Sequence, residues 1–244
     1  MNRPTLVLGT VLTTMLAVGC AGDDGSAEGS TAAASDGPTT TMSAADSTGT
    51  MPTEGEACTS EFPAIVADID ETLTLSDGEF FMQIGDGTYD PAEREGAAEM
   101  INAYAALGYR VLYLTARSEM IVLEGTGETA RDATARWIDE HGFPNDPATT
   151  ALVLAESFVV DDAARDYKAQ ALMDLQAMGW RFDFAYGNAT SDIGAYAAAG
   201  IALDSTFIIG EHAGVEGTVA VEGEGWVDHT AAHVSGVPQA CPGQ

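Results

Sequence analysis

The sequence predicts an α/β fold built on a doubly wound parallel sheet. Short apolar runs alternate with amphipathic stretches of helical periodicity between residues 64 and 209, and this alternation is typical of a parallel sheet with helices on both faces. Apolar residues make up 45% of the 244 residues and charged residues 19%, which fits a globular domain and excludes fibrous or wholly disordered chains. In such a sheet the ligand site lies beyond the carboxyl ends of the strands.

The first part of the domain predicts two strands and the helix between them. Residues 64–70 form an apolar run that ends in acids, which predicts a buried strand. Asp90 and Pro91 are typical of a helix start, and apolar side chains at helical spacing predict a helix over 90–107. Residues 109–115 predict the second strand. No long insert separates the two strands, so we expect a minimal cap over the site.

The second part continues the same alternation. Each helix has apolar residues on one face and a glycine or proline close to its end, and each strand is a short apolar or aromatic run. The predicted helices cover residues 128–140, 166–178 and 191–199, and the predicted strands cover residues 150–155, 181–186 and 206–209.

The first 20 residues have the features of a bacterial lipoprotein leader. Arg3 supplies a positive charge ahead of the apolar residues 6–18, which are too few to span a membrane comfortably. The run Leu16–Cys20 resembles a lipobox. We therefore expect residues 1–19 to be a signal peptide and Cys20 to be lipidated, with ordinary signal cleavage and an incidental cysteine as the alternative.

A flexible tether is predicted for residues 20–57. This stretch is rich in Gly, Ser, Thr, Ala and Asp and contains no Lys, Arg or aromatic residue, so it cannot bury enough apolar surface to fold. We expect a folded domain over residues 58–244, anchored by lipid outside the cytoplasm on a bacterial membrane. Cys58 and Cys241 bracket this domain, and an oxidising compartment would favour a disulfide between them over two free thiols.

The charge of the chain excludes one class of partner. Nine Lys and Arg residues face 38 Asp and Glu residues, which gives a formal net charge of −29. A nucleic acid needs Lys and Arg to replace its counterions, and docking of a basic patch on anionic lipid needs them too. The sequence therefore predicts no nucleic-acid partner, and the acidic surface is best interpreted as a solubility feature.

Paired acids at the end of the first strand are the strongest chemical signal. Asp68 and Asp70 are two residues apart, so on a strand they point the same way. Crowding two carboxylates costs repulsion and desolvation. A divalent cation explains the pair most simply, because hard carboxylate oxygens suit Mg²⁺.

Three further segments fall near the same edge of the predicted sheet. Thr115 closes the second strand, Lys168 lies in an otherwise acidic helix, and residues 187–192 with Asn188 and Asp192 form the turn after the fourth strand. Each feature alone is commonplace. Their order along the chain makes the set specific.

These segments resemble the four motifs of the haloacid dehalogenase superfamily of aspartate-nucleophile phosphatases. Residues 68–72 are similar to the first motif, Thr115 to the second, Lys168 to the third, and Asn188 with Asp192 to the fourth. Within the superfamily, the chain looks most like the lipin-type phosphatidate phosphatase (LNS2) branch, and this likeness covers residues 64–210. The runs that carry it are His141–Pro144, Tyr167–Asp174, Ala185–Asn188, Asp192–Tyr196, Gly200–Ile201 and Phe207–Ile209.

The resemblance implies a HAD-like Rossmannoid fold and a two-step hydrolysis. Asp68 would attack phosphorus and form an aspartyl-phosphate. Asp70 would protonate the leaving alkoxide and then accept a proton from the hydrolytic water. Thr115 would hydrogen-bond the phosphoryl oxygens, and Lys168 would hold the nucleophile and neutralise phosphate charge.

Magnesium is the cofactor that the resemblance implies. Its ligands would be Asp68, the backbone carbonyl of Asp70, and Asn188, with Asp192 in its inner or outer shell. Two positions depart from the lipin pattern. Glu71 stands where lipins usually carry glycine, and Ala189 stands where they often carry arginine.

The sequence leaves three hypotheses open for the substrate and the function. A site with a minimal cap suits a bulky phosphomonoester such as phosphatidic acid. A broad-specificity secreted acid phosphatase is favoured by Glu71 and disfavoured by residues 187–200. A non-catalytic phosphatidate-binding module is the third possibility, and the presence of both Asp68 and Asp70 argues against it.

Two other features have weaker interpretations. His229 and His233 have the spacing of zinc ligands on a helix, but surface histidines are the better interpretation because no third ligand is evident. Residues 73–89 follow the catalytic strand, and we expect either a flap over the site or a local hairpin there.

Overall fold

Six parallel strands form one sheet in the computed structural model, which describes residues 60–241. The strand order is β3-β2-β1-β4-β5-β6. The strands are β1 (Phe62–Ala67), β2 (Arg110–Ser118), β3 (Thr150–Ala155), β4 (Trp180–Gly187), β5 (Thr206–Ile209) and β6 (Val219–Val221). The chain winds outward from β1 to β3 and then returns to β4 on the other side of β1. This is the doubly wound topology, so the predicted fold class is confirmed.

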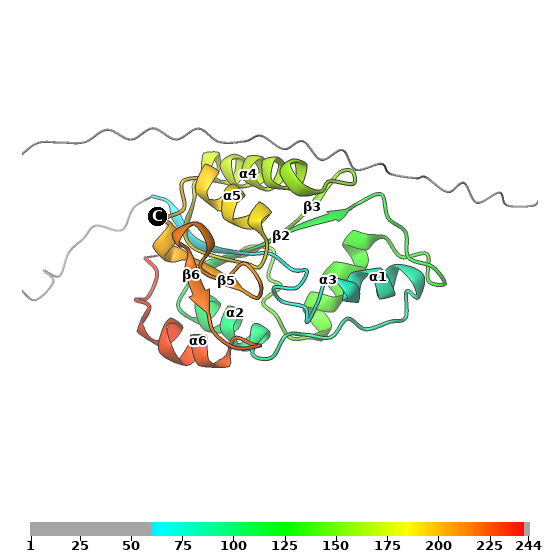
Figure 1. The fold of residues 1–244 in the computed structure, drawn as a ribbon, viewed down its shortest axis with the longest axis horizontal. Helices are drawn as coiled ribbons and strands as arrows, with labels where there is room; N and C mark the ends of the chain where they lie inside the picture. Colours follow the sequence, from blue (N-terminus) through cyan, green and yellow to red (C-terminus); the bar gives the residue numbers. More distant parts are fainter. Residues whose placement is uncertain (1–59, 242–244) are drawn as a thin grey trace, which may run out of the picture. The chain divides into compact units, whose positions relative to one another are not determined.

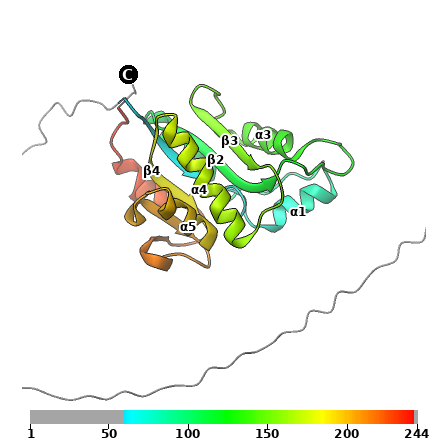
Figure 2. The same ribbon diagram turned by 90° about the horizontal axis from the view of Figure 1, so that it is seen from above.

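Helices cover both faces of the sheet (Figures 1 and 2). The side chains of β1 alternate between two cores, because Ile65 and Ala67 join one apolar cluster while Ala64 and Val66 join the other. The helices are α1 (Gly78–Gly85), α2 (Ala97–Ala106), α3 (Ala130–Glu140), α4 (Asp161–Ala177), α5 (Thr190–Ala198) and α6 (Val227–Ala232), and short 3₁₀ turns occupy Leu203–Ser205, Val215–Gly217 and Val234–Gly236. Figure 1 shows α4 and α5 on one side of the sheet and α2 and α6 on the other.

The helix predicted from Asp90 begins at Ala97, so that part of the prediction is wrong. Gly96 has a φ of 77°, in the left-handed region, which is outside helical geometry. The helix therefore begins directly after Gly96. The residues before it make long-range contacts instead of a helical turn. The carbonyl of Pro91 accepts a hydrogen bond of 2.8 Å from the indole of Trp137. Local cap signals could not show this competing tertiary contact.

Residues 73–89 contain helix α1 and no hairpin. Two other elements are longer than expected, since β2 continues to Ser118 and α4 starts at Asp161. Within the described residues, the connection between β1 and β2 carries α1 and α2 and no separate cap domain.

The C-terminal segment packs behind the loop that follows β1. The indole of Trp226 is fully buried and donates a 2.9 Å hydrogen bond to the carbonyl of Thr72. Arg94 joins the same two segments, because it donates to the carbonyls of Glu71 at 2.8 Å and Glu224 at 2.7 Å. Residues near the end of the chain therefore support the loop that carries the paired acids.

His229 on α6 and His233 directly after it are half-buried and not the exposed histidines expected from the sequence. Their rings stack on each other with centroids 5.2 Å apart, and both pack against Phe207. The hydroxyl of Tyr186 lies 3.1 Å from Nε2 of His229. Burial, together with the neighbouring His233, lowers the pKa of His229 to about 4, so the ring is neutral at pH 7 and belongs to an aromatic core.

Several predictions fall on residues 1–59, which lie outside the described residues. They are the signal peptide, the tether, the lipidation of Cys20 and the role of Cys58. Cys241 is disulfide-bonded, and its pairing with Cys58 stays a prediction. Within residues 60–241, none of the helices has the length and apolar character needed to cross a bilayer.

Candidate active site

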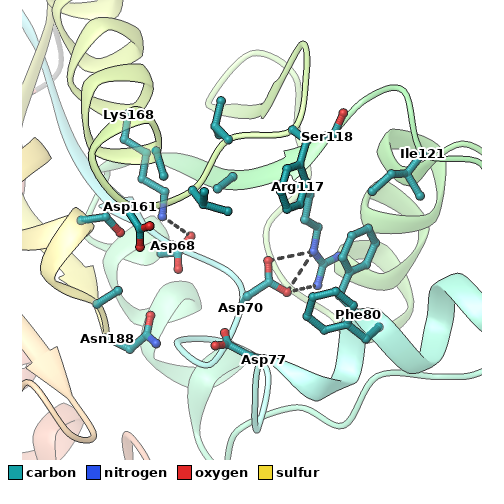
Figure 3. A pocket seen from close by; sticks show the side chains of 18 of the residues that line it. Asp68, Asp70, Asp77, Phe80, Arg117, Ser118, Ile121, Asp161, Lys168 and Asn188 are labelled. Carbon is teal, nitrogen blue, oxygen red and sulfur yellow. Dashed lines mark hydrogen bonds and ion pairs between the residues drawn. The ribbon is translucent and has the colours of Figure 1, made fainter. Parts of the chain in front are cut away.

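The structure brings the predicted site residues to one edge of the sheet. Asp68 directly follows β1, and Lys168 reaches it from the second turn of α4. The ammonium of Lys168 lies 2.7 Å from Oδ1 of Asp68 (Figure 3). It also lies 2.6 Å from Oδ1 of Asp192. Lys168 thus shares one buried ion cluster with residues 100 and 24 positions away in the sequence.

The charges in this cluster do not balance. Burial raises the pKa of Asp68 to about 8, although the charge of Lys168 opposes the shift. Burial would lower the pKa of Lys168, but the charges of Asp192 and Asp68 more than offset it and raise that pKa above its ordinary value. One buried ammonium is therefore shared by two buried carboxylates. Lys168 alone therefore does not keep Asp68 charged at neutral pH, and a further cation beside Asp68 would stabilise its carboxylate form.

Asp70 faces an arginine that the sequence analysis did not include in the site. The guanidinium of Arg117 binds the Asp70 carboxylate in bidentate fashion, with distances of 2.8 to 3.1 Å (Figure 3). Arg117 is only 4% exposed. It also donates to Thr134 at 2.9 Å, and its guanidinium carbon lies 4.2 Å from the ring centroid of Phe80. Asp70 is held by a rigid, planar partner.

Thr115 belongs to the same cluster. Its hydroxyl donates to Oδ2 of Asp70 at 3.0 Å and accepts from the backbone N–H of Arg117 at 3.2 Å. The side chain is fully buried and does not line the pocket. The structure thus places Thr115 on Asp70, whereas the sequence analysis assigned it to the phosphoryl oxygens.

Asn188 lies opposite these residues and faces the pocket. Its Nδ2 donates to Oε2 of Glu71 at 3.1 Å, and its Oδ1 accepts from the hydroxyl of Thr72 at 3.1 Å. A carboxylate only accepts hydrogen bonds, so Glu71 fixes which end of the amide is the oxygen. Glu71 itself has a φ of 56°, the left-handed region that few residues other than glycine adopt. The residue with this strained backbone is thus the one whose side chain contacts Asn188.

Asp192 holds the site together and does not face the pocket. One carboxylate oxygen binds Lys168, and the other accepts from the backbone N–H groups of Asn188 and Ala189, at 3.1 Å each. This carboxylate caps the start of α5 and fixes the loop that carries Asn188. Its geometry supports an outer position around a cation more than direct ligation.

A pocket of about 330 Å³ opens beside these groups. We call its charged and amide side chains the polar wall, namely Asp68, Asp70, Asp77, Arg117, Asp161, Lys168 and Asn188, and its large apolar side chains the apolar wall, namely Phe80, Phe81, Ile84, Ile121, Phe158, Val159 and Val160. Burial, followed by the charges of Glu71 and Asp70, raises the pKa of Asp77. The polar wall therefore has more acids than cations, because four aspartates face Lys168 and Arg117. Helix α1 supplies Phe80 and Phe81, so it occupies the position expected of a small flap.

The polar wall carries oxygen donors of the chemical type that would hold a divalent cation. Among residues 60–241, no group of three or more His, Cys, Asp or Glu side chains is arranged to hold a metal. The candidate set differs from such a cluster, because it combines the Asp68 carboxylate with the Asn188 amide oxygen and the Asp70 backbone carbonyl. These are hard oxygen donors of the kind that Mg²⁺ prefers.

A family model and several known proteins are similar to this chain. The family model for the LNS2 domain of PITM 1-3 matches residues 65–210. Membrane-associated phosphatidylinositol transfer protein 3 from Homo sapiens is 29% identical over 135 residues, which cover 55% of this chain and 12% of that protein. Protein retinal degeneration B from Drosophila melanogaster is 26% identical over 173 residues, which cover 70% of this chain and 12% of that protein. The chain thus spans about an eighth of the length of these relatives.

Solved structures give weaker likenesses. A phospho-aspartyl intermediate analogue of phosphoserine phosphatase aligns with a TM-score of 0.38 and 13% identity, over 61% of this chain and 87% of the other. The cobalt-bound deoxy-D-mannose-octulosonate 8-phosphate phosphatase from Haemophilus influenzae aligns with a TM-score of 0.37 and 16% identity, over 62% and 71%.

Proposed function

Because this chain belongs to the LNS2 family of the haloacid dehalogenase superfamily, we propose that it is a Mg²⁺-dependent phosphomonoester hydrolase that acts through an aspartyl-phosphate. The observation that carries the proposal is the buried cluster of Asp68, Lys168 and Asp192 beside a pocket whose acids exceed its cations. A purely structural ion cluster would not need an open pocket on Asp68.

The first chemical step uses the two aspartates at the end of β1. A carboxylate oxygen of Asp68 attacks phosphorus, and the bond from phosphorus to the ester oxygen breaks. Asp70 leaves its ion pair with Arg117, takes up a proton and gives that proton to the leaving alkoxide. Lys168 stays charged and balances the negative charge that gathers around Asp68.

The second step releases phosphate. Asp70, now a carboxylate, accepts a proton from water as that water attacks the phosphoryl group. The bond from phosphorus to the Asp68 oxygen breaks, and the free carboxylate is restored. Asp68, the Asp70 carbonyl and Asn188 would hold Mg²⁺. Its positive charge would reduce the repulsion between the Asp68 carboxylate and a phosphate dianion.

The two walls of the pocket support an amphiphilic substrate. A phosphate placed against Asp68 and Lys168 leaves the remainder of the molecule beside Phe80, Ile84 and Ile121. An apolar group gains free energy along such a wall, whereas a sugar or nucleotide would lose hydrogen bonds to water. We therefore assign the substrate to the phosphomonoesters with an apolar group, of which phosphatidic acid is an example.

One assay separates this function from its rivals. Phosphate release is measured from phosphatidic acid in mixed micelles, from a nucleoside monophosphate and from an aryl phosphate, each with Mg²⁺ or with excess chelator. The proposal expects Mg²⁺-dependent release that is fastest with phosphatidic acid. Equal turnover of all three substrates would indicate a broad acid phosphatase, and binding of phosphatidic acid without turnover would indicate a non-catalytic module. Full activity in chelator would remove the metal from the mechanism.

Arg117 is expected to position Asp70 for proton transfer. Replacing Arg117 by Gln should slow hydrolysis of an alkyl phosphate by about 100-fold, because an alkoxide needs a proton to leave. Hydrolysis of p-nitrophenyl phosphate should fall by less than about tenfold, because nitrophenolate leaves without protonation. The comparison of kcat on the two substrates is the measurement. Arg136→Gln, which removes an ion pair with Glu128 and Glu140 outside the pocket, is the matched control. An equal loss on both substrates would contradict the assignment.

Glu71 is expected to orient Asn188 for the cation. Glu71→Ala should weaken Mg²⁺ affinity by about tenfold or more, as loss of an outer partner does at other metal sites. Glu71→Gln should stay within about threefold of the wild type, since its amide oxygen can accept the same hydrogen bond. Affinity is read from the Mg²⁺-dependent rise in unfolding temperature, which needs no turnover. If the Gln and Ala variants lose affinity equally, the carboxylate acts through its charge and not through orientation.

The location of the protein is proposed from residues 1–57 alone. We propose a lipid on Cys20 and an extracytoplasmic domain at a bacterial membrane. Metabolic labelling with a fatty acid checks this, and a Cys20→Ser variant that is labelled as strongly as the wild type would contradict it.

A further inference from the structure

Exposed apolar side chains gather around the mouth of the pocket. Phe81, Phe158 and Val160 line the pocket, yet they are 68%, 73% and 51% exposed. Eleven large apolar residues are exposed in the described part of the chain. Three of them line the pocket, and four others lie within two positions of a lining residue in the sequence: Leu75, Met82, Met120 and Val122. Exposed apolar surface concentrated in this way marks an interaction site. We call Phe81, Phe158 and Val160 the apolar rim.

The apolar rim is continuous with the apolar wall inside the pocket. Phe80 and Phe81 are neighbours on α1, and the ring of Phe80 packs on the guanidinium of Arg117 beside Asp70. Figure 3 shows Phe80 and Ile121 on the same side of the pocket, opposite Asn188. An apolar path therefore leads from the exposed surface to the reacting groups. A partner seated on the rim would be in contact with the apolar part of a bound substrate.

The charges around the mouth do not suit an anionic partner. Arg117 is paired with Asp70, Arg131 with Glu119, and Arg165 with Asp162 and Asp166. Asp77 and Asp161 lie on the lining itself. Docking on anionic lipid requires Lys or Arg that can face the lipid. The rim thus combines apolar side chains with neighbouring acids. This combination fits a partner whose interior is apolar and whose surface carries no net charge, as in a zwitterionic bilayer.

A protein partner would fit this position less well than a lipid surface. The rim borders the opening through which substrate must enter and product must leave. A folded protein that covered the rim would close that opening. A fluid bilayer covers the same side chains and at the same time delivers amphiphilic molecules to the mouth.

We propose that the apolar rim is the membrane-docking face of this protein. Phe81, Phe158 and Val160 insert among the acyl chains of a zwitterionic bilayer, and the pocket opens onto the headgroup layer. The identity of the molecule taken from the bilayer rests on the proposed function. Docking itself requires no turnover, so the two can fail separately.

Vesicle flotation with purified full-length chain tests the proposal. All proteins carry Cys20→Ser, so that a lipid anchor does not mask binding by the folded domain. The probe is a phosphatidylcholine vesicle, and a second set contains phosphatidylglycerol as the anionic component. We expect the parent protein to float with phosphatidylcholine, and Phe81→Ser/Phe158→Ser to bind at least about tenfold less, because two aromatic side chains no longer leave water.

The matched control lies at the far end of α4. Met173 and Met178 are 41% and 64% exposed, and Met178 is separated from Val160 by the 17 residues of this helix, roughly 25 Å. Met173→Ser/Met178→Ser should bind as the parent protein does. The unfolding temperatures of all variants show that each is folded.

Three results would overturn the proposal. They are no flotation of the parent protein with phosphatidylcholine, an equal loss in the two double variants, and tighter binding to the vesicles that contain phosphatidylglycerol. If the parent protein floats as expected but releases no phosphate from any substrate, the docking face stands and the proposed hydrolase does not.

Discussion

Replacing Asp68 by Asn is expected to reduce phosphate release by about 10⁴-fold or more, because an amide cannot act as the attacking nucleophile. The side chain keeps its size and can still accept a hydrogen bond from Lys168, so the fold should be preserved. The variant also removes one of two buried carboxylates that share a single ammonium. Its free energy of unfolding should therefore equal or exceed that of the wild type, which separates loss of chemistry from loss of structure.

Two measurements check the Asp68 prediction. Phosphate release gives the rate, and acid quenching during turnover traps any phosphorylated protein, which should appear in the wild type and be absent from Asp68→Asn. Asp174→Asn, an exposed acid on α4 that bonds only Gln170 among the hydrogen bonds described, is the control for a change of charge. Wild-type turnover by Asp68→Asn would refute the nucleophile assignment and the hydrolytic mechanism with it.

Replacing Lys168 by Met is expected to have the largest effect on stability. The variant leaves the carboxylates of Asp68 and Asp192 buried without a cation, and breaking a buried pair in this way costs about 3–5 kcal/mol. Phosphate release should fall as well, because Lys168 balances charge around the nucleophile. Urea unfolding in the absence of Mg²⁺ measures the free energy of unfolding, and the same samples serve for the activity assay.

A double variant shows whether charge imbalance is the cause. Lys168→Met/Asp192→Asn removes one cation and one anion together, so it should recover most of the lost stability and none of the activity. Stability that stays low in the double variant would mean that packing of the lysine stem, rather than its charge, supports this part of the domain.

The convergence of Asp68, Thr115 and Asn188 could be predicted because it follows from strand topology. Parallel strands place their carboxyl ends at one edge, so acids, a hydroxyl and an amide at successive strand ends must approach one another. The bounds of β3 and β5 could also be predicted, because a short apolar run flanked by polar residues leaves little choice of where the strand begins and ends.

The role of Arg117 could not be predicted in the same way. Its partner Asp70 is 47 residues away, and nothing in the local pattern distinguishes a site arginine from an arginine at a strand end. The start of α2 was missed because Asp90 and Pro91 have good capping chemistry, but a tertiary contact to Trp137 prevailed over it. Periodicity and composition do not reveal tertiary contacts of this kind. The sequence therefore predicts the edge of the sheet at which the site lies, but not the contacts that orient its side chains.

The bond from Trp226 to Thr72 also has a consequence for biosynthesis. The loop that carries the paired acids is made early, but its support comes from residues translated more than 150 positions later. A ribosome-bound fragment that stops before residue 226 contains Asp68 and Asp70 without the indole that binds the adjoining backbone. This support for the loop is therefore acquired only after residue 226 has been made, and a chain cut between β1 and residue 226 would carry Asp68 and Asp70 on a backbone that lacks this hydrogen bond.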